Sequence, residues 1–250
     1  MKNKGAIIML AWPETEAIQV GSWYEPITKL LGFNKNGYYI AGHSALVLLE
    51  PKTGALHYFD FGRYHTPAKH GRVRDKYTDP DLSVKEIAEF NAEGEIINLN
   101  SLLLALSKYK SFHGKGNMFA SINYDFDFKK AFAFAKNQQE KDAIIYGPFA
   151  YKGTNCSRFT SRVYRSGNQK FYKKIQTILP LSLTQTPVGN VLIASNKNSF
   201  YKIENSFIHN YEANIFTFLK HWTLPPIKAV PFIFKKKLSL LNANEILAKN

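Results

Sequence analysis

The N-terminal part of the chain shows runs of apolar residues that predict β-strands. Residues 5–12 are almost entirely apolar and predict a buried strand. A second apolar run, residues 43–49, is followed by Pro51 and Gly54, which supply the fixed and the positive φ values of a turn. Residues 55–61 then resume a strand pattern, so the second and third runs predict a β-hairpin.

Other segments are predicted from spacing, caps and chain breakers. Phe159 and Val163 recur four residues apart and predict a helix that Thr154 or Asn155 caps. Residues 62–82 are polar and rich in glycine, arginine and histidine, which predicts a long surface loop. The remaining expected elements are helices over residues 23–31, 100–106 and 128–141, strands over 118–124 and 187–195, and short extended pieces at 38–40 and 144–146.

The length and composition are those of an ordered globular protein. With 250 residues and 45% hydrophobic content, the chain can bury a substantial core. We expect one domain over residues 1–195 and a C-terminal extension over residues 196–250 that packs on it. The first apolar run is short and has no small-residue cleavage pattern after it, which argues against a signal peptide. A cytoplasmic location is expected, periplasmic export stays open, and no segment is long enough to cross a membrane.

The charge balance is strongly basic and favours anionic partners. The chain has 33 Lys and Arg against 19 Asp and Glu, a net charge of +14. This charge is spread along the chain, and the signatures of nucleic-acid modules are absent, so nucleic acid is the least favoured partner. An anionic surface or ligand stays open. A single cysteine excludes a disulfide framework and a cysteine-rich metal site, and no metal or cofactor is expected.

That single cysteine, Cys156, is the main candidate for chemistry. It lies at the predicted start of a helix, where free backbone N–H groups and the helix dipole stabilise a thiolate. The same N–H groups are placed to bind an oxyanion. Its neighbours in residues 153–157 are small and polar. This favours a reactive thiol over a packed structural thiol, which is the alternative for a free cysteine.

The hairpin register supplies a base for this thiol. A turn centred on residues 52–53 pairs residues whose numbers sum to 105, which places His43 opposite Gly62 and diagonal to Asp60. A carboxylate beside an imidazole fixes its tautomer and favours its charged form. We therefore expect His43 as the base and Asp60 as its orienting group. A one-residue slip in the register would move His57 to the face of His43, so His57 is the alternative third member. The alternative for His43 itself is a buried structural histidine with its hydrogen bonds satisfied.

These residues carry a family resemblance. The histidine strand from Gly42, Asp60 on the next strand and the later helix start at residues 154–159 resemble the circularly permuted papain-like superfamily. This group includes the lecithin–retinol acyltransferase type and bacterial cell-wall hydrolases of the NlpC type, and its histidine precedes its cysteine, as here. An uncharacterised bacterial branch is similar over residues 11–15, 58–64, 71–74 and 155–159. The resemblance implies an α+β, circularly permuted papain-like fold, with an antiparallel sheet packed against the helix that carries the cysteine.

The resemblance also implies a function. A thiol hydrolase, either a peptidase or an amidase, would attack a peptide, amide or ester with Cys156 and pass through an acyl-enzyme. The alternatives are an acyltransferase of the same fold, and a catalytically inactive module that binds a cell-wall or lipid ligand through its arginines. Candidate substrate-binding residues are Trp12, Arg63, Arg72, His113 and Asn155, and candidates for the second oxyanion donor are Trp12 and Tyr151.

Overall fold

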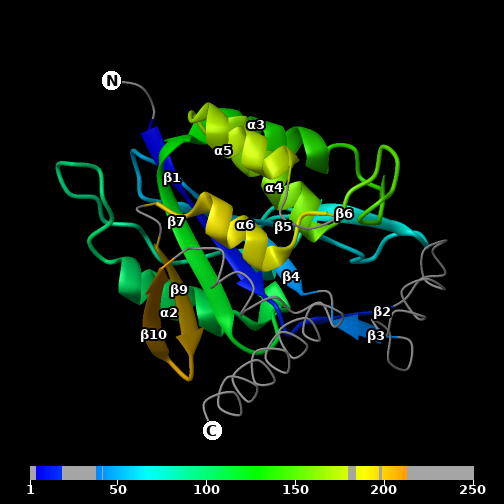
Figure 1. Cartoon of the computed structure of the whole chain (residues 1–250), viewed down its shortest axis with the longest axis horizontal. Helices are drawn as coiled ribbons and strands as arrows, with labels where there is room; N and C mark the ends of the chain where they lie inside the picture. The colour runs from blue at the N-terminus through cyan, green and yellow to red at the C-terminus, as the bar shows by residue number, and fades with distance from the viewer. Residues whose placement is uncertain (1–3, 19–37, 41, 180–183, 197–198, 213–250) are drawn as a thin grey trace, which may run out of the picture.

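A computed structural model describes residues 4–18, 38–40, 42–179, 184–196 and 199–212 (Figure 1). Its centre is an eight-stranded sheet in the order β10-β9-β7-β1-β4-β5-β6-β8, in which all neighbouring strands run antiparallel. The strands of this sheet are β1 (Lys4–Trp12), β4 (His43–Leu49), β5 (Leu56–Gly62), β6 (His70–Arg74), β7 (Met118–Asp127), β8 (Ile144–Ile145), β9 (Ser199–Glu204) and β10 (Phe207–Glu212). A separate antiparallel pair joins β2 (Glu16–Ile18) to β3 (Tyr38–Ile40).

Helices cover both faces of the sheet. In the described part of the chain they are α2 (Leu99–Lys108), α3 (Phe128–Gln139), α4 (Cys156–Gly167), α5 (Phe171–Ile178) and α6 (Pro187–Ala194), with short 3₁₀ turns at Pro80–Leu82 and Lys110–Phe112. Helices α3, α4 and α6 pack on one face, and α5 packs against α4 and α6 (Figure 1). The apolar side of α2 packs on the opposite face. The protein is therefore a mixed α+β structure with two cores.

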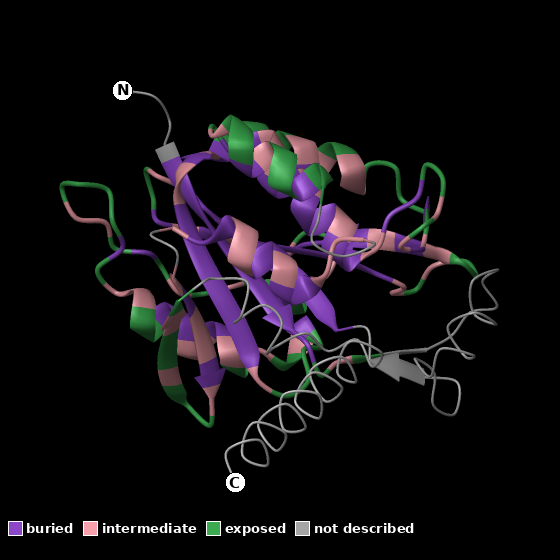
Figure 2. Ribbon diagram, in the orientation of Figure 1, coloured by how far each residue is buried: buried purple, intermediate pink, exposed green. Residues whose placement is uncertain are grey.

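The central strands β1 and β4 are buried along most of their length (Figure 2). Alternate side chains of β4 enter the two cores: Ala45 and Val47 pack on the α2 side, and Leu46 and Leu48 pack on the α3 and α4 side. A strand covered on both faces needs apolar residues at every position. This explains the continuous apolar runs, and the predicted strand at residues 5–12 is confirmed.

The hairpin forms in the predicted register. Ala45 pairs with Asp60 and Leu49 pairs with Leu56, so the paired residue numbers sum to 105. Tyr58 points into the core on the α2 side, while Phe59 points to the side covered by α3 and α4. The side chains of β5 are therefore distributed between the two faces as the hairpin pattern predicts.

Two predicted elements are wrong. Residues 62–82 are not one surface loop, because they contain β6, which pairs with both β5 and β8. Residues 187–195 are not a strand but the helix α6. Thr186 caps this helix through a hydrogen bond from Gly189 N to its hydroxyl, and Pro187 occupies the first turn, where its missing N–H costs nothing. The apolar run that follows suits a buried helix as well as a strand.

The C-terminal part is described only to residue 212. Strands β9 and β10 lie beyond the expected boundary at residue 195 and extend the central sheet through β7. The rest of the expected extension, and the helix predicted over residues 23–31, lie outside the described residues. Among the helices that the structure describes, none combines the length and the apolar character that a membrane span requires.

Candidate active site

Cys156 is the first residue of α4, as the sequence predicts. Asn155 caps the helix, because its side-chain Oδ1 accepts a hydrogen bond from Arg158 N at 2.8 Å. The thiol is only 6% exposed. Its sulfur lies 4.0 Å from Gly42 O and accepts a hydrogen bond from the backbone N–H of Ser44. The thiol therefore lies against the start of β4, the strand that carries the candidate base.

His43 opens β4 and contacts both other members of the predicted constellation. Its imidazole hydrogen-bonds the Cys156 thiol. Its Nε2 lies 3.2 Å from Asp60 Oδ2, which leaves Nδ1 as the ring nitrogen available to the thiol. In the β1–β4 pairing His43 is opposite Trp12, and the two rings stack with centroids 5.8 Å apart. The structure thus brings Cys156, His43 and Asp60 into one continuous chain of contacts.

Asp60 is fully buried and its carboxylate is held by three side chains. Oδ2 accepts hydrogen bonds from His43 Nε2, from the Tyr58 hydroxyl at 2.9 Å and from Arg74 Nη2 at 2.7 Å. Oδ1 accepts a bond from Arg74 Nε at 3.0 Å, so the arginine grips both oxygens. The ring of Tyr64 lies over the guanidinium carbon of Arg74 at 3.4 Å. A buried charge needs such partners, and Asp60 has them on both oxygens.

The pKa values follow from these contacts. Burial lowers the pKa of His43, but the hydrogen bonds to Asp60 and Cys156 outweigh burial and raise it to about 9. Burial raises the pKa of Asp60, but the bonds from His43 and Arg74 lower it to about 2. Burial raises the pKa of the Cys156 thiol, and the bond to His43 with its positive charge lowers it below its ordinary value. Near neutral pH these contacts favour an imidazolium between a thiolate and a carboxylate.

A buried hydrogen-bond network fixes α4 against the base strand. Ser44, next to His43, shares a hydroxyl–hydroxyl bond of 2.9 Å with Thr160 of α4. Asn190 of α6 donates its amide to Thr160 Oγ1 at 3.0 Å and to Ser157 O at 2.7 Å. All of these side chains are buried, so the network sets the distance between thiol and imidazole rather than leaving it to a loop.

Aromatic residues surround the base on the side away from α4. Trp12 meets Phe112 edge to face at 6.3 Å, and Tyr58 stacks on Phe112 at 3.8 Å. Gly114 lies so close to the indole that a Cβ there would fall 2.2 Å from its ring atoms. The exposed His113 stacks on Tyr64 at 5.4 Å. These rings exclude water from the imidazole–carboxylate pair, and the loop after residue 112 borders the site.

The other predicted site residues have mixed positions. Arg72 is bound by both oxygens of Asp79, at 2.7 Å each, and donates its Nε to Tyr64 O, so its charge is committed within the protein. Arg63 lies over the ring of Tyr146 at 5.1 Å. Asn155 uses its side chain as the helix cap. Tyr151, a candidate oxyanion donor, is 84% exposed.

His57, the alternative third member, lies on the opposite face of the hairpin. Its ring packs edge to face against Phe132 at 5.2 Å, and its buried Nε2 has no hydrogen-bond partner among the described residues. Burial lowers its pKa, and the charge of Lys76 lowers it further. Nothing in this position connects His57 with Cys156.

Sequence reasoning missed the role of Arg74. Arg74 is not among the candidate residues named from the sequence, whereas the structure buries it against Asp60. Burial alternates over residues 70–73 of β6, and Arg74 departs from the alternation because it pairs directly with Asp60 of β5. A strand pattern there, next to β5, would have put an arginine beside the carboxylate.

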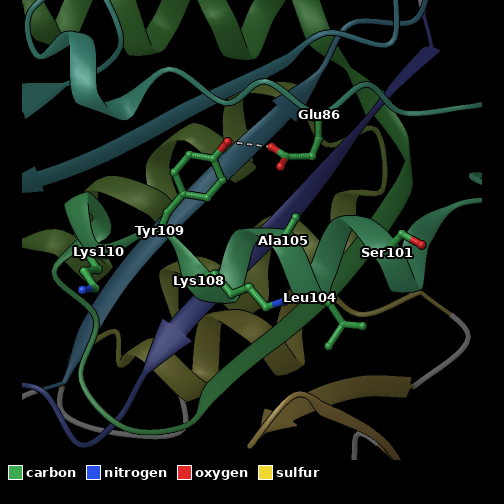
Figure 3. A pocket seen from close by; sticks show the side chains of 7 residues that line it. All are labelled: Glu86, Ser101, Leu104, Ala105, Lys108, Tyr109 and Lys110. Atoms are coloured by element: carbon green, nitrogen blue, oxygen red, sulfur yellow. Dashed lines mark hydrogen bonds between the residues drawn. The ribbon is translucent and has the colours of Figure 1, made fainter.

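A hollow of 680 Å³ lies elsewhere in the described structure, beside α2, and Leu104 and Ala105 are among the residues that line it (Figure 3). Tyr109 donates its hydroxyl to Glu86 Oε2 at 2.7 Å at its edge. It contains no thiol and no imidazole, so we place the chemistry at Cys156. The described residues include no cluster of three or more His, Cys, Asp and Glu side chains able to hold a metal ion.

Two comparisons with known proteins match most of the chain. The family described as type VI secretion system effector TseH-like matches residues 7–171, a range that includes the hairpin and helix α4. A crystal structure of the type VI secretion system effector TseH superposes with a TM-score of 0.54 and 16% sequence identity, covering 85% of this chain and 100% of that one. At this identity the structural match shows a common fold. No curated protein sequence matches the chain.

Proposed function

We propose a hydrolytic function for this chain, which belongs to the TseH-like family of type VI secretion system effectors. The protein would be a secreted effector that cleaves an amide, peptide or ester bond with a cysteine nucleophile. One observation carries this proposal: the unbroken contact chain from the Cys156 thiol through His43 to the Asp60 carboxylate. A thiol that only packs in a core has no need of an imidazole with a buried counter-ion.

The proposed reaction has two steps. The Cys156 thiolate attacks the carbonyl carbon, and the imidazolium of His43 gives its proton to the departing amine or alcohol. The product is a thioester between Cys156 and the acyl group. Neutral His43 then takes a proton from water, whose oxygen attacks the thioester and releases the acid and the thiol.

Each group has a role that its position supports. Asp60 stabilises the imidazolium and fixes which ring nitrogen faces the thiol. The backbone N–H of Cys156, in the first turn of α4, is the proposed oxyanion donor. Trp12 stacks on the base and keeps water from it. The neighbouring His113 loop and Trp12 are the proposed boundary of the substrate groove.

The fold and the substrate class are part of the proposal. We infer a circularly permuted papain-like arrangement from the order of histidine strand and cysteine helix. A peptidase or amidase is the preferred activity, and an acyltransferase would use the same first step with another acceptor. The expected cytoplasmic location before secretion stays a prediction.

Intact-mass spectrometry tests the proposal on the full chain. Incubation with p-nitrophenyl acetate should give a mass increase of one acetyl group that then decays as the thioester hydrolyses. Cys156→Ala should show no adduct, and His43→Ala should form it slowly. Faster decay with an added amine would favour the acyltransferase. Equal labelling of wild type and Cys156→Ala, or no adduct in either, would reject a catalytic thiol and favour an inactive binding module.

A further inference from the structure

A second site of unassigned function lies between α3 and α4, away from the thiol. A groove of 350 Å³ is lined by three cationic side chains, Lys141, Arg162 and Arg165, and by no acidic one. The other lining residues are Phe134, Gln138 and Ser166. We call this the arginine groove. Its volume falls at the lower end of the range for small-ligand sites.

The two arginines of the groove differ from the other half-buried or buried arginines. Arg72 and Arg74 each have a carboxylate partner, and Arg158 donates to two backbone carbonyls, each at 3.1 Å. In the part of the chain that the structure describes, Arg162 and Arg165 have no hydrogen bond and no ion pair. Partly burying a guanidinium without a partner is unfavourable. An anion from outside would supply the missing partner.

Helix electrostatics account for only one of these cations. Arg165 lies in the last turn of α4, where the helix dipole favours positive charge. Arg162 lies in mid-helix and gains little from the dipole. Burial lowers the pKa values of Arg162, Arg158 and Arg165, and the charge of Arg162 lowers those of Arg158 and Arg165 further. The cations therefore repel one another, which an anionic ligand would relieve.

We propose that the arginine groove binds a phosphate group. A phosphate offers three strong acceptor oxygens and about two negative charges, so it can engage both guanidinium forks and the Lys141 ammonium together. A carboxylate has fewer acceptor oxygens and a single charge, and would leave part of the site unpaired. The Gln138 and Ser166 side chains add neutral hydrogen-bonding groups at the groove wall.

The phosphate has two possible sources, a soluble phosphate ester or a phospholipid head group. Helix α5 bears on this question because it packs against α4 and leaves a row of large apolar side chains exposed. These are Phe171 (75% exposed), Tyr172 (55%), Ile175 (40%), Ile178 (56%) and Leu179 (72%). An exposed apolar face on a helix that packs against α4, which carries the groove arginines, suits a bilayer surface. The experiment therefore needs an arm for each source.

Binding of inorganic phosphate to the full chain is measured by calorimetry at low salt, for wild type, for a variant without the groove arginines and for a control variant. The groove variant is Arg162→Gln/Arg165→Gln, and the matched control is Lys52→Gln/Lys129→Gln, which removes the same charge from two exposed positions outside the groove. We expect saturable binding by wild type and control, and binding at least about tenfold weaker in the groove variant. Thermal unfolding of each variant checks that it is folded.

A second arm uses sedimentation with phosphatidylcholine vesicles, with or without phosphatidylglycerol. Binding only to the anionic vesicles, lost in the groove variant and competed by free phosphate, would identify a head group. Phosphate binding without vesicle binding would identify a soluble ligand. The proposal is wrong if wild type binds neither, or if groove and control variants weaken binding equally, since a diffuse positive field would then explain it. Neither binding experiment depends on Cys156, so failure of the phosphate proposal can be told apart from failure of the hydrolase proposal.

Discussion

His43 Nε2 and Asp60 Oδ2 lie 3.2 Å apart across two neighbouring antiparallel strands. Because Asp60 pairs with Ala45, two residues after His43, the contact is diagonal across the hairpin. The length of the turn between β4 and β5 thus determines that the imidazole and the carboxylate meet.

Removing the charge of Asp60 should abolish most of the reactivity. In Asp60→Asn the imidazolium loses its counter-ion and its orientation. We expect the rate of acyl-enzyme formation to fall by up to about 10⁴-fold, the loss known for Asp→Asn at an orienting carboxylate. Stopped-flow measurement of nitrophenol release gives this rate. A loss of less than about fivefold would mean that Asp60 only supports the fold.

Arg74 and Asp60 should depend on each other for stability. Arg74→Met leaves a fully buried carboxylate with one cation fewer, and we expect a loss of about 3–5 kcal/mol in unfolding free energy. The matched variant Arg72→Met breaks a more exposed ion pair with Asp79 and should cost about 1 kcal/mol or less. Urea titrations compare the two. Equal losses would show that burial of the Asp60–Arg74 pair is not what matters.

The same pair offers a test that separates folding from chemistry. Asp60→Asn/Arg74→Met removes both charges, so no unpaired charge stays buried. Its loss of unfolding free energy should therefore be smaller than the sum of the losses in the two single variants. Its acyl-enzyme formation should stay as slow as that of Asp60→Asn. Restored reactivity in the double variant would contradict a role for the carboxylate in orienting His43.

Gly42 should be required for the position of His43. Its φ is +70°, and a Cβ there would meet Pro187 at 3.0 Å and Pro13 at 3.2 Å. Gly42→Ala should therefore lose stability and displace the base, lowering the labelling rate. Gly94→Ala has a similar backbone, φ +81°, but open space around the new methyl group. It should show only the strain of about 1–2 kcal/mol and no loss of labelling rate. If both variants label normally, the close approach at Gly42 does not position His43.

Replacing His57 should leave the chemistry intact. Its buried Nε2 lacks a partner in the described structure and its ring packs on Phe132. His57→Leu removes an unsatisfied polar atom, so we expect unchanged labelling and a stability equal to wild type or higher by about 1–3 kcal/mol. His43→Leu is the matched control and should form the adduct only slowly, as His43→Ala does. Loss of labelling in His57→Leu would indicate that His57 acts as the third member of the constellation with Cys156 and His43.

Local patterns predicted the parts of the site that depend on neighbours in sequence. The turn residues Pro51 and Gly54 predicted the hairpin register. The polar residues before the helically spaced apolar residues predicted the start of the helix and its Asn155 cap. Both signals act over a few residues. The pairing of His43 with Asp60 could therefore be predicted before the fold was known.

Features that depend on tertiary contacts could not be predicted. Strand β6 is short and carries arginines at positions that a surface loop would also carry, and only the buried Asp60 explains why Arg74 is inside. The segment of α6 is apolar enough for either a strand or a helix, and the cap at Thr186 was the decisive sign. Helix α5 was not predicted, although Phe171, Ile175 and Ile178 recur at helical spacing.

The central claim is that Cys156 and His43 share a proton, and the pH dependence of iodoacetamide alkylation tests it most directly. Cys156 is the only cysteine of the chain, so every alkylation event reports on it. The lowered thiol pKa and the His43 pKa of about 9 mean that the ion pair persists below pH 9. It is lost on the acid side when the thiolate takes a proton, and on the alkaline side when His43 releases one.

We predict that alkylation of wild type reaches a plateau below the ordinary thiol pKa and keeps it up to about pH 9, followed by a second rise as His43 becomes neutral. His43→Gln should lose the plateau and show one ionisation at a higher pH than the wild-type thiol, because the hydrogen bond and charge of His43 no longer oppose burial. Superimposable pH profiles for wild type and His43→Gln would contradict the account, since they would show that the imidazole does not activate the thiol.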